Sequence, residues 1–242
     1  MNPVAPRHPN PNAPVPRRRT SAALLSGLSV VAGLGLTLAP TGTVAGAAPA
    51  PNEIAPNEIV GDPHSPHVAR LAEEALVSLA AYDVADAPAD ESVYVDDLMA
   101  TAGATADELG ISEIALQRAW GRAARDHQVA VLTALTQLGV PYRSNTSEEG
   151  VGFDCSGLTS FAWGEAGVDL ARQSGAQIND TEAREPGTAM AGDLAQYPGH
   201  VMMYLGADGA VVHAANPESE VELWRLNERR AASVRYGDPT DS

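Results

Sequence analysis

Apolar residues recur at helical spacing through much of the middle of the chain. Residues 67–84 place Val and Leu side chains three and four positions apart, which puts them on one helix face. Similar patterns cover 93–102 and 111–138, with Gly103 and Gly110 between them. We therefore predict three helices over these ranges. The last should end near "QLGVPY", where Gly139 can adopt a left-handed conformation and Pro141 prevents continuation.

The pattern becomes that of β-strands in the last third of the chain. In "HVMMYLGADGAVVHAA" (200–215), two short apolar runs flank Asp208 and Gly209, a strong hairpin signal. The segment 221–226, "VELWRL", alternates as a third strand. Helices followed by antiparallel strands predict an α+β fold.

Residues 1–47 carry four arginines and no acidic residue. Within this range the arginines precede an apolar run over 22–39, and the small-residue stretch "TVAGAAPA" begins at residue 43. This is the pattern of a cleaved export signal of the Sec or Tat type, ending at Ala47. The apolar run is short and glycine-rich, so we expect no integral membrane span after processing. We therefore predict a protein that is secreted.

The whole chain has 15 basic and 31 acidic residues. Removal of residues 1–47 leaves 11 basic against 31 acidic residues, a net charge of −20. Such a surface repels nucleic acid and anionic membranes, so we expect no nucleic-acid partner. From these patterns we divide the chain into five parts: a signal peptide (1–47), a linker (48–63), a helical region acting as cap or spacer (64–127), a main domain (128–232) and a tail (233–242).

The segment "GFDCSGLTSFAWGEAG" contains the chain's single cysteine, Cys155. Apolar residues at helical spacing follow it, and Asp154 stands before it as a natural N-cap. Cys155 should therefore occupy the first turn of a helix. There, backbone N–H groups and the positive end of the helix dipole favour a nucleophilic thiolate, so we expect a lowered thiol pKa. The alternatives are an intermolecular disulfide and a buried structural cysteine.

A thiol nucleophile needs a base, and His200 and His213 lie in the strand-rich part. In a two-residue hairpin Tyr204 faces His213, so His200, Met202, Tyr204 and His213 share one face. That register separates the two histidines by roughly 13 Å along the sheet. A kink, bulge or longer loop must then bring them within hydrogen-bonding reach. Taken singly, each histidine also fits a solvated strand residue.

Two segments together resemble the NlpC/P60 family of papain-like cysteine peptidases. These are "GVPYRSN…GFDCSGLTSFAWGEAGVDL" and "AGDLAQYPGHVMMYLGADGAVVHAA", and the resemblance extends over about 129–226. It implies a papain-like domain, with helices packed on a small antiparallel sheet. It further implies hydrolysis of peptide bonds in peptidoglycan stem peptides, of the D-γ-glutamyl–diaminopimelate type, without a cofactor or metal.

By this resemblance Cys155 is the nucleophile, His200 the base and later the acid, and His213 the residue that orients His200. Tyr142, Asp154 and Ser156 would contact the substrate. The sequence departs from the family where Arg143 and "SNTSEEG" replace an aromatic–glycine–glycine stretch.

Three alternatives stay open at the level of sequence. One is a catalytically silent module that binds or scaffolds cell wall on the same fold. Another is a thiol acyltransferase, since hydrolysis and transfer share the same nucleophile. The third is a metal site made of one cysteine, two histidines and a carboxylate, although the spacing does not resemble a zinc finger or ribbon. We also hypothesise that the helical region 64–127 covers the cleft and restrains activity.

Overall fold

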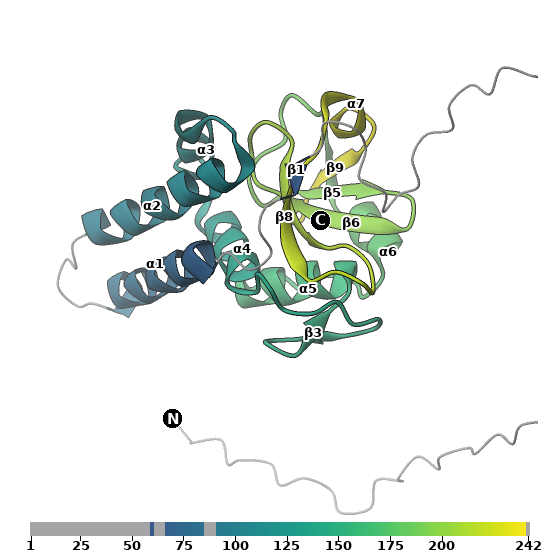
Figure 1. The fold of residues 1–242 in the computed structure, drawn as a ribbon, viewed down its shortest axis with the longest axis horizontal. Coiled ribbons are helices and arrows are strands. Elements are labelled where there is room, and N and C mark those ends of the chain that lie inside the picture. Colours follow the sequence, from purple (N-terminus) through teal and green to yellow (C-terminus); the bar gives the residue numbers. More distant parts are fainter. Residues whose placement is uncertain (1–58, 61–65, 85–90, 241–242) are drawn as a thin grey trace, which may run out of the picture. The chain divides into compact units, whose positions relative to one another are not determined.

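The computed structural model describes residues 59–60, 66–84 and 91–240 (Figure 1). The predicted signal peptide, and most of the predicted linker, lie outside the described residues. Of the linker range, Ile59–Val60 forms β1, which pairs antiparallel with the strand at 221–225. Among the described residues, no helix combines the length and apolar character needed to cross a membrane.

Four helices come first in the described chain, and two of the predicted helix boundaries are wrong. They are α1 (Pro66–Val84), α2 (Glu91–Leu109), α3 (Glu113–Trp120) and α4 (Arg125–Thr136). α2 continues through Gly103, because Ala106 and Leu109 beyond it are fully buried. A Cβ at Gly103 would lie 3.2 Å from the Glu113 Oε1 atom, so glycine lets α3 approach closely.

The predicted continuous helix over 111–138 is divided in two. α3 ends at Trp120, and the extended backbone of Ala124, with ψ of 161°, starts α4 in a new direction. Trp120 is 1% exposed, and its indole N–H donates to the Leu205 carbonyl oxygen at 2.9 Å. The break therefore coincides with a side chain anchored on the sheet. Gly139 has a φ of 83°, which confirms the left-handed residue predicted after the helix.

The helices and the sheet share one hydrophobic core. α1 packs against α2 and α4, and α4 packs against α5 (Cys155–Glu165). One cluster of buried side chains extends from Val68 in α1 to Leu223 in the sheet. The boundary that we placed between residues 127 and 128 falls inside α4, so the described structure does not divide there.

A seven-stranded antiparallel sheet forms the second layer, in the order β1-β8-β7-β6-β5-β9-β4. Arg235–Asp238 lies in the range that we predicted as a tail, and that prediction is wrong. These residues form β9, which pairs with β5 on one side and β4 on the other. The further strands are β4 (Glu182–Arg184), β5 (Leu194–Tyr197), β6 (His200–Tyr204), β7 (Ala210–Ala214) and β8 (Val221–Arg225).

Both faces of this sheet are buried, which explains why its central strands are almost continuously apolar. In β6, Val201 and Met203 join the core beneath the helices, whereas Met202 and Tyr204 join a second cluster on the other face. The remaining elements are short: β2 (Ser147–Glu148), β3 (Gly152–Phe153), α6 (Ser174–Asn179) and α7 (Glu228–Ala231). The α+β fold class predicted from the sequence is thus observed.

Candidate active site

The loop before α5 and the first turn of that helix place Cys155. Asp154 caps the helix as predicted, with its Oδ1 accepting the Gly157 N–H at 2.8 Å. Leu158 and Ala162 are fully buried beneath the helix and fix its position against the sheet. Gly157 is required here because a Cβ would overlap the Thr146 carbonyl group. Cys155 is therefore the first residue of α5, and its position beside β6 is fixed.

The electrostatic setting of Cys155 differs from our expectation of a lowered thiol pKa. Burial raises the pKa of the thiol, and the Asp154 carboxylate adds to this increase. The backbone N–H groups of Val201 and Ser156 act in the opposite direction but do not outweigh burial. The first-turn donors that we predicted are present, yet the thiol in the free protein remains protonated. The influence of the Val201 N–H also places the sulfur next to the start of β6.

His200 and His213 meet through a hydrogen bond of 2.8 Å between His200 Nε2 and His213 Nδ1. Both side chains are buried, with exposures of 3% and 1%. His200 also stacks on Tyr197, with ring centroids 5.2 Å apart. Burial, together with His213 and Arg230, lowers the pKa of His200 well below its ordinary value. His200 is therefore a neutral imidazole, able to accept a proton.

The predicted hairpin register is wrong, and the difference is what brings the two histidines together. Tyr204 lies opposite Val211 rather than His213. Asp208 and Gly209, with φ of 51° and 73°, form the expected tight turn, closed by the Ala210 N–H and the Ala207 carbonyl. The Leu205 N–H donates to the Ala210 carbonyl at 2.8 Å, so Gly206, with φ of 96°, and Ala207 are two extra residues between the ladder and the turn. They shift the pairing by two residues.

Glu222 is a site residue that the sequence analysis missed. It lies directly opposite His213 in the β7–β8 ladder, and its Oε1 is 3.6 Å from His213 Nε2. Burial raises the pKa of Glu222 to about 7 and, with Arg230, lowers that of His213 to about 3. His213 Nε2 has no hydrogen-bond partner within the described structure. The sequence signal for Glu222 was a charged residue in an otherwise apolar strand. Its pairing with His213 depends on the register between β7 and β8, which could not be predicted from the sequence.

The three residues predicted to contact substrate lie around the nucleophile. Arg172 donates to both Asp154 oxygens, at 2.9 and 2.6 Å, and to Ser156 Oγ at 2.9 Å. Burial raises the pKa of Asp154, but Arg172 and two backbone N–H groups hold it below its usual value. The pKa of Tyr142 is raised by burial and then by the nearby Cys155 and Asp154. Arg172 is thus the group that Asp154 and Ser156 orient.

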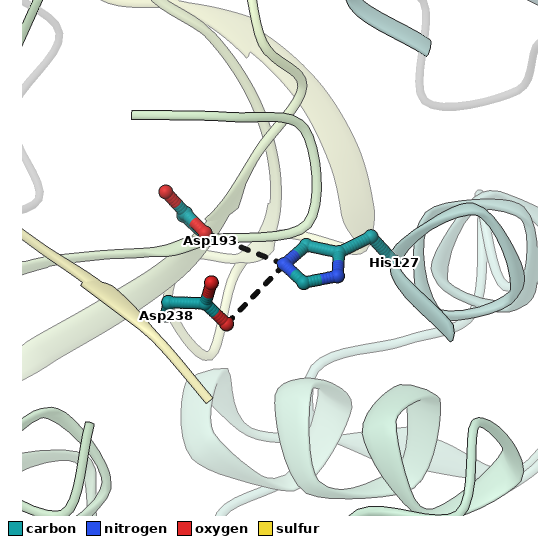
Figure 2. A group of neighbouring side chains, drawn as sticks. All are labelled: His127, Asp193 and Asp238. Carbon is teal, nitrogen blue, oxygen red and sulfur yellow. Dashed lines mark ion pairs between the residues drawn. The ribbon is translucent and has the colours of Figure 1, made fainter. Parts of the chain in front are cut away.

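A second group of polar side chains lies in the core and was not predicted. His127 Nε2 faces Asp238 Oδ1 at 3.3 Å and Asp193 Oδ1 at 3.6 Å (Figure 2). Within the described ranges, these three residues form the one group of His, Cys, Asp or Glu donors that could hold a metal ion. Cys155, His200 and His213 do not form such a group, which argues against the metal site that we considered for them.

Two surface hollows of the described chain lie away from Cys155 and from both site histidines. The larger, of about 650 Å³, lies among α1, α2 and α3, and acidic residues such as Asp107 and Glu113 line part of it. The other lies between the start of α4 and the end of α5.

Comparison with known proteins agrees with this geometry. Residues 139–235 match the sequence profile of the NlpC/P60 family. Relatives include a γ-D-glutamyl-L-lysine dipeptidyl-peptidase from Bacillus cereus, 35% identical over an alignment of 113 residues; the match covers 41% of this chain and 33% of the relative. Another is the peptidoglycan endopeptidase RipB from Mycobacterium tuberculosis, 36% identical over an alignment of 112 residues; the match covers 40% of this chain and 46% of RipB. Residues 139–235 thus belong to the NlpC/P60 family.

Among solved structures, RipD from Mycobacterium tuberculosis matches with 26% identity and a TM-score of 0.40. The match covers 48% of this chain and 98% of RipD, which is described as a non-catalytic NlpC/P60 domain protein adapted to peptidoglycan binding. The chain spans less than half the length of the two curated relatives above.

Proposed function

We propose that this protein is an exported cysteine peptidase that hydrolyses peptide bonds in peptidoglycan stem peptides, of the D-γ-glutamyl–diaminopimelate type. The observation that carries the proposal is the buried His200–His213 hydrogen bond beside the strand whose Val201 N–H reaches the Cys155 sulfur. A silent binding module needs no such pair. The names of the B. cereus and RipB relatives support peptidoglycan peptides as the substrate class.

In the proposed mechanism the attack and the proton transfer occur together. The Cys155 thiol is neutral at rest and His200 is an unprotonated imidazole, so His200 removes the thiol proton as sulfur bonds to the scissile carbonyl carbon. The backbone N–H groups of the first turn of α5 stabilise the oxyanion. His200 then protonates the leaving amine as the C–N bond breaks, which leaves a thioester on Cys155.

Water completes the reaction in the same site. His200 accepts a proton from the attacking water, and the thioester collapses to a carboxylic acid and the free thiol. His213 orients His200 throughout: by accepting the His200 Nε2–H at its Nδ1, it leaves the other ring nitrogen of His200 as the base. If an amine replaced water at this step, the same site would act as a thiol acyltransferase.

The test is digestion of purified muropeptides and stem peptides by residues 48–242, followed by mass spectrometry. We expect a defined cleavage product that is lost in Cys155→Ala and in His200→Gln. His67→Gln, which changes an exposed histidine of α1, serves as the matched control and should keep full activity. Absence of product from the unmutated protein, together with retained binding to peptidoglycan, would instead identify the silent module. Products carrying a new amine would identify the transferase.

Export has its own measurement. We expect the protein recovered from the culture medium of a secreting host to begin at Ala48. A protein that retains residues 1–47 in the membrane fraction would contradict the proposed cleavage.

A further inference from the structure

The buried side chains of His127, Asp193 and Asp238 come from three parts of the chain. His127 lies in α4, Asp193 immediately precedes β5, and Asp238 ends β9. Their exposures are 1%, 0% and 2%. Figure 2 shows both carboxylates directed at the same edge of the imidazole ring, the one that carries Nε2. Charged groups are rarely buried so completely unless each has a strong partner.

The distances do not fit a simple ion pair. Charge-assisted hydrogen bonds between nitrogen and a carboxylate oxygen are about 2.7–2.9 Å long. Here His127 Nε2 lies 3.3 Å from Asp238 Oδ1 and 3.6 Å from Asp193 Oδ1. Neither His127 Nε2 nor Asp193 Oδ1 has a hydrogen-bond partner within the described chain. Two ligands each ~2.1 Å from a tetrahedral zinc ion lie ~3.4 Å apart, and this is the spacing observed.

The hydrogen bonds around these three residues leave His127 Nε2 and Asp193 Oδ1 without a partner in the described structure, so both atoms are available for an ion. Asp126 Oδ1 lies 3.0 Å from His127 Nδ1, so a proton on Nδ1 can be donated to it, which directs the Nε2 lone pair at the carboxylates. Asp193 Oδ2 accepts the Met190 N–H at 2.8 Å. A carboxylate behind a metal-binding histidine is the usual outer partner in zinc sites, where it fixes the ring tautomer.

The second carboxylate, Asp238, accepts hydrogen bonds at both of its oxygens, including Oδ1, which faces His127. Asp238 Oδ2 accepts from Arg184 at 2.6 Å, and Thr240 donates its N–H and its hydroxyl to Oδ1, at 2.9 and 2.7 Å. Burial lowers the pKa of His127, but Asp193, Asp126 and Asp238 together raise it above its ordinary value. The carboxylates of Asp126, Asp193 and Asp238 carry three negative charges. A divalent ion and Arg184 would together neutralise them, whereas a protonated His127 imidazole and Arg184 would leave one negative charge.

We propose that His127, Asp193 and Asp238 form a structural site for a divalent transition-metal ion, with zinc as the best fit to one imidazole and two carboxylates. This site is separate from the proposed peptidase chemistry, and it differs from the absence of a metal that we expected from the sequence. It joins the helical region to one end of the antiparallel β5–β9 pair, where Asp193 precedes β5 and Asp238 ends β9. A water molecule completes the coordination as the fourth ligand.

The test uses the full chain carrying Cys155→Ala, so that the thiol and His200 cannot supply a competing site. We expect calorimetric titration with Zn²⁺ to give a stoichiometry of about one, and Zn²⁺ to raise the melting temperature relative to EDTA. Co²⁺ should give visible absorption bands of a four-coordinate oxygen and nitrogen site. No binding of either ion to this variant would overturn the proposal.

Three further variants, made in the same Cys155→Ala background, locate the ion. Asp193→Asn should weaken Zn²⁺ binding by more than ~100-fold, and Asp126→Asn, which removes only the outer partner, by ~10–100-fold. His67→Gln, the matched control on α1, should bind as tightly as its parent. Equal affinity in the Asp193→Asn variant would overturn the assignment. If that variant fails to fold by circular dichroism, the Asp126→Asn result and the Co²⁺ spectrum decide.

Discussion

The thiol and the imidazole of the candidate active site are both neutral in the free protein. Burial has opposite effects on the two groups, raising the pKa of Cys155 and lowering that of His200. A preformed thiolate–imidazolium pair is therefore not the resting state. The ordinary pKa of a thiol is 9.0, and that of Cys155 is higher, so we expect the rate of its alkylation by iodoacetamide to keep rising beyond pH 9.0. A rate that is constant from pH 6 upward would contradict this prediction.

Glu222 controls which ring nitrogen of His213 carries a proton. As a carboxylate 3.6 Å from His213 Nε2, it favours the tautomer of His213 that carries its proton on Nε2, so that Nδ1 is free to accept from His200. Because the pKa of Glu222 is about 7, this carboxylate forms as pH rises through 7. The pKa values of His200 and His213 lie too low to produce the same change. We expect kcat/KM to rise through pH 7.

Two variants separate positioning from packing at Glu222. Glu222→Gln keeps an acceptor oxygen but does not titrate, so it should keep part of the activity and lose the rise near pH 7. Glu222→Leu should lose most activity at every pH, by ~10–100-fold in kcat with little change in KM, because it removes the acceptor. An unchanged pH profile in Glu222→Gln would exclude the role.

The residues of the candidate site could be predicted only in part from the sequence. Cys155 and Asp154 could be placed because a cap and a helix start are local features. The direction of the thiol pKa could not, since burial by β6 and the rest of the fold outweighs the first-turn donors. Glu222 and His127 act on partners distant in the chain, and a single sequence does not reveal such pairs.

At the level of elements, α5 is held against the loop 144–147 with no space between them. We expect Gly157→Ala to destabilise the protein by about 1–3 kcal/mol, because the new Cβ would overlap the Thr146 carbonyl and displace Cys155. Gly164→Ala is the matched control in the same helix. It meets nothing within 4 Å and should stabilise by about 0.5–1 kcal/mol. Urea unfolding and peptidase activity measure both effects, and equal stability of the two variants would contradict the argument.

The existence and type of the main elements followed from the sequence, whereas several boundaries and one register did not. Gly103 stays in α2 because tertiary burial beyond it outweighs the helix propensity of one glycine. The Asp208–Gly209 turn was predicted, but the two extra residues before it, Gly206 and Ala207, were not. β9 was missed because "RYGD" is short and polar, and its pairing partners lie forty residues and more upstream.

At the level of the whole molecule, the helical region is attached to the hairpin end of β6 and not to the end that carries His200. Trp120 bonds to Leu205, and Arg225 NH1 donates to the Gly110 carbonyl at 3.3 Å. These contacts favour a supporting role for the helices over the cover that we hypothesised. The comparison of turnover by residues 48–242 and 126–242 still tests that hypothesis. Faster turnover by the shorter chain would support the cover.

The contribution of the helical region to stability can be measured at Trp120. We expect Trp120→Ala to lower the free energy of unfolding by about 3–5 kcal/mol, since it removes a fully buried indole. Trp120→Phe keeps most of the packing and should cost less, leaving the Leu205 carbonyl without its donor at about 1–3 kcal/mol. Chemical denaturation measures both. A loss below 1 kcal/mol in Trp120→Ala would mean that the helices are dispensable.

The place of β9 in the sheet has a consequence for how the protein is made. β5 receives its second neighbour, and β4 its only neighbour in the described sheet, from residues 235–238. A nascent chain that has emerged only as far as β8 cannot close this side of the sheet or bring Asp238 to His127. The core thus stays unfinished until residues 235–238 are free to pair, and a shorter nascent chain remains open to chaperones.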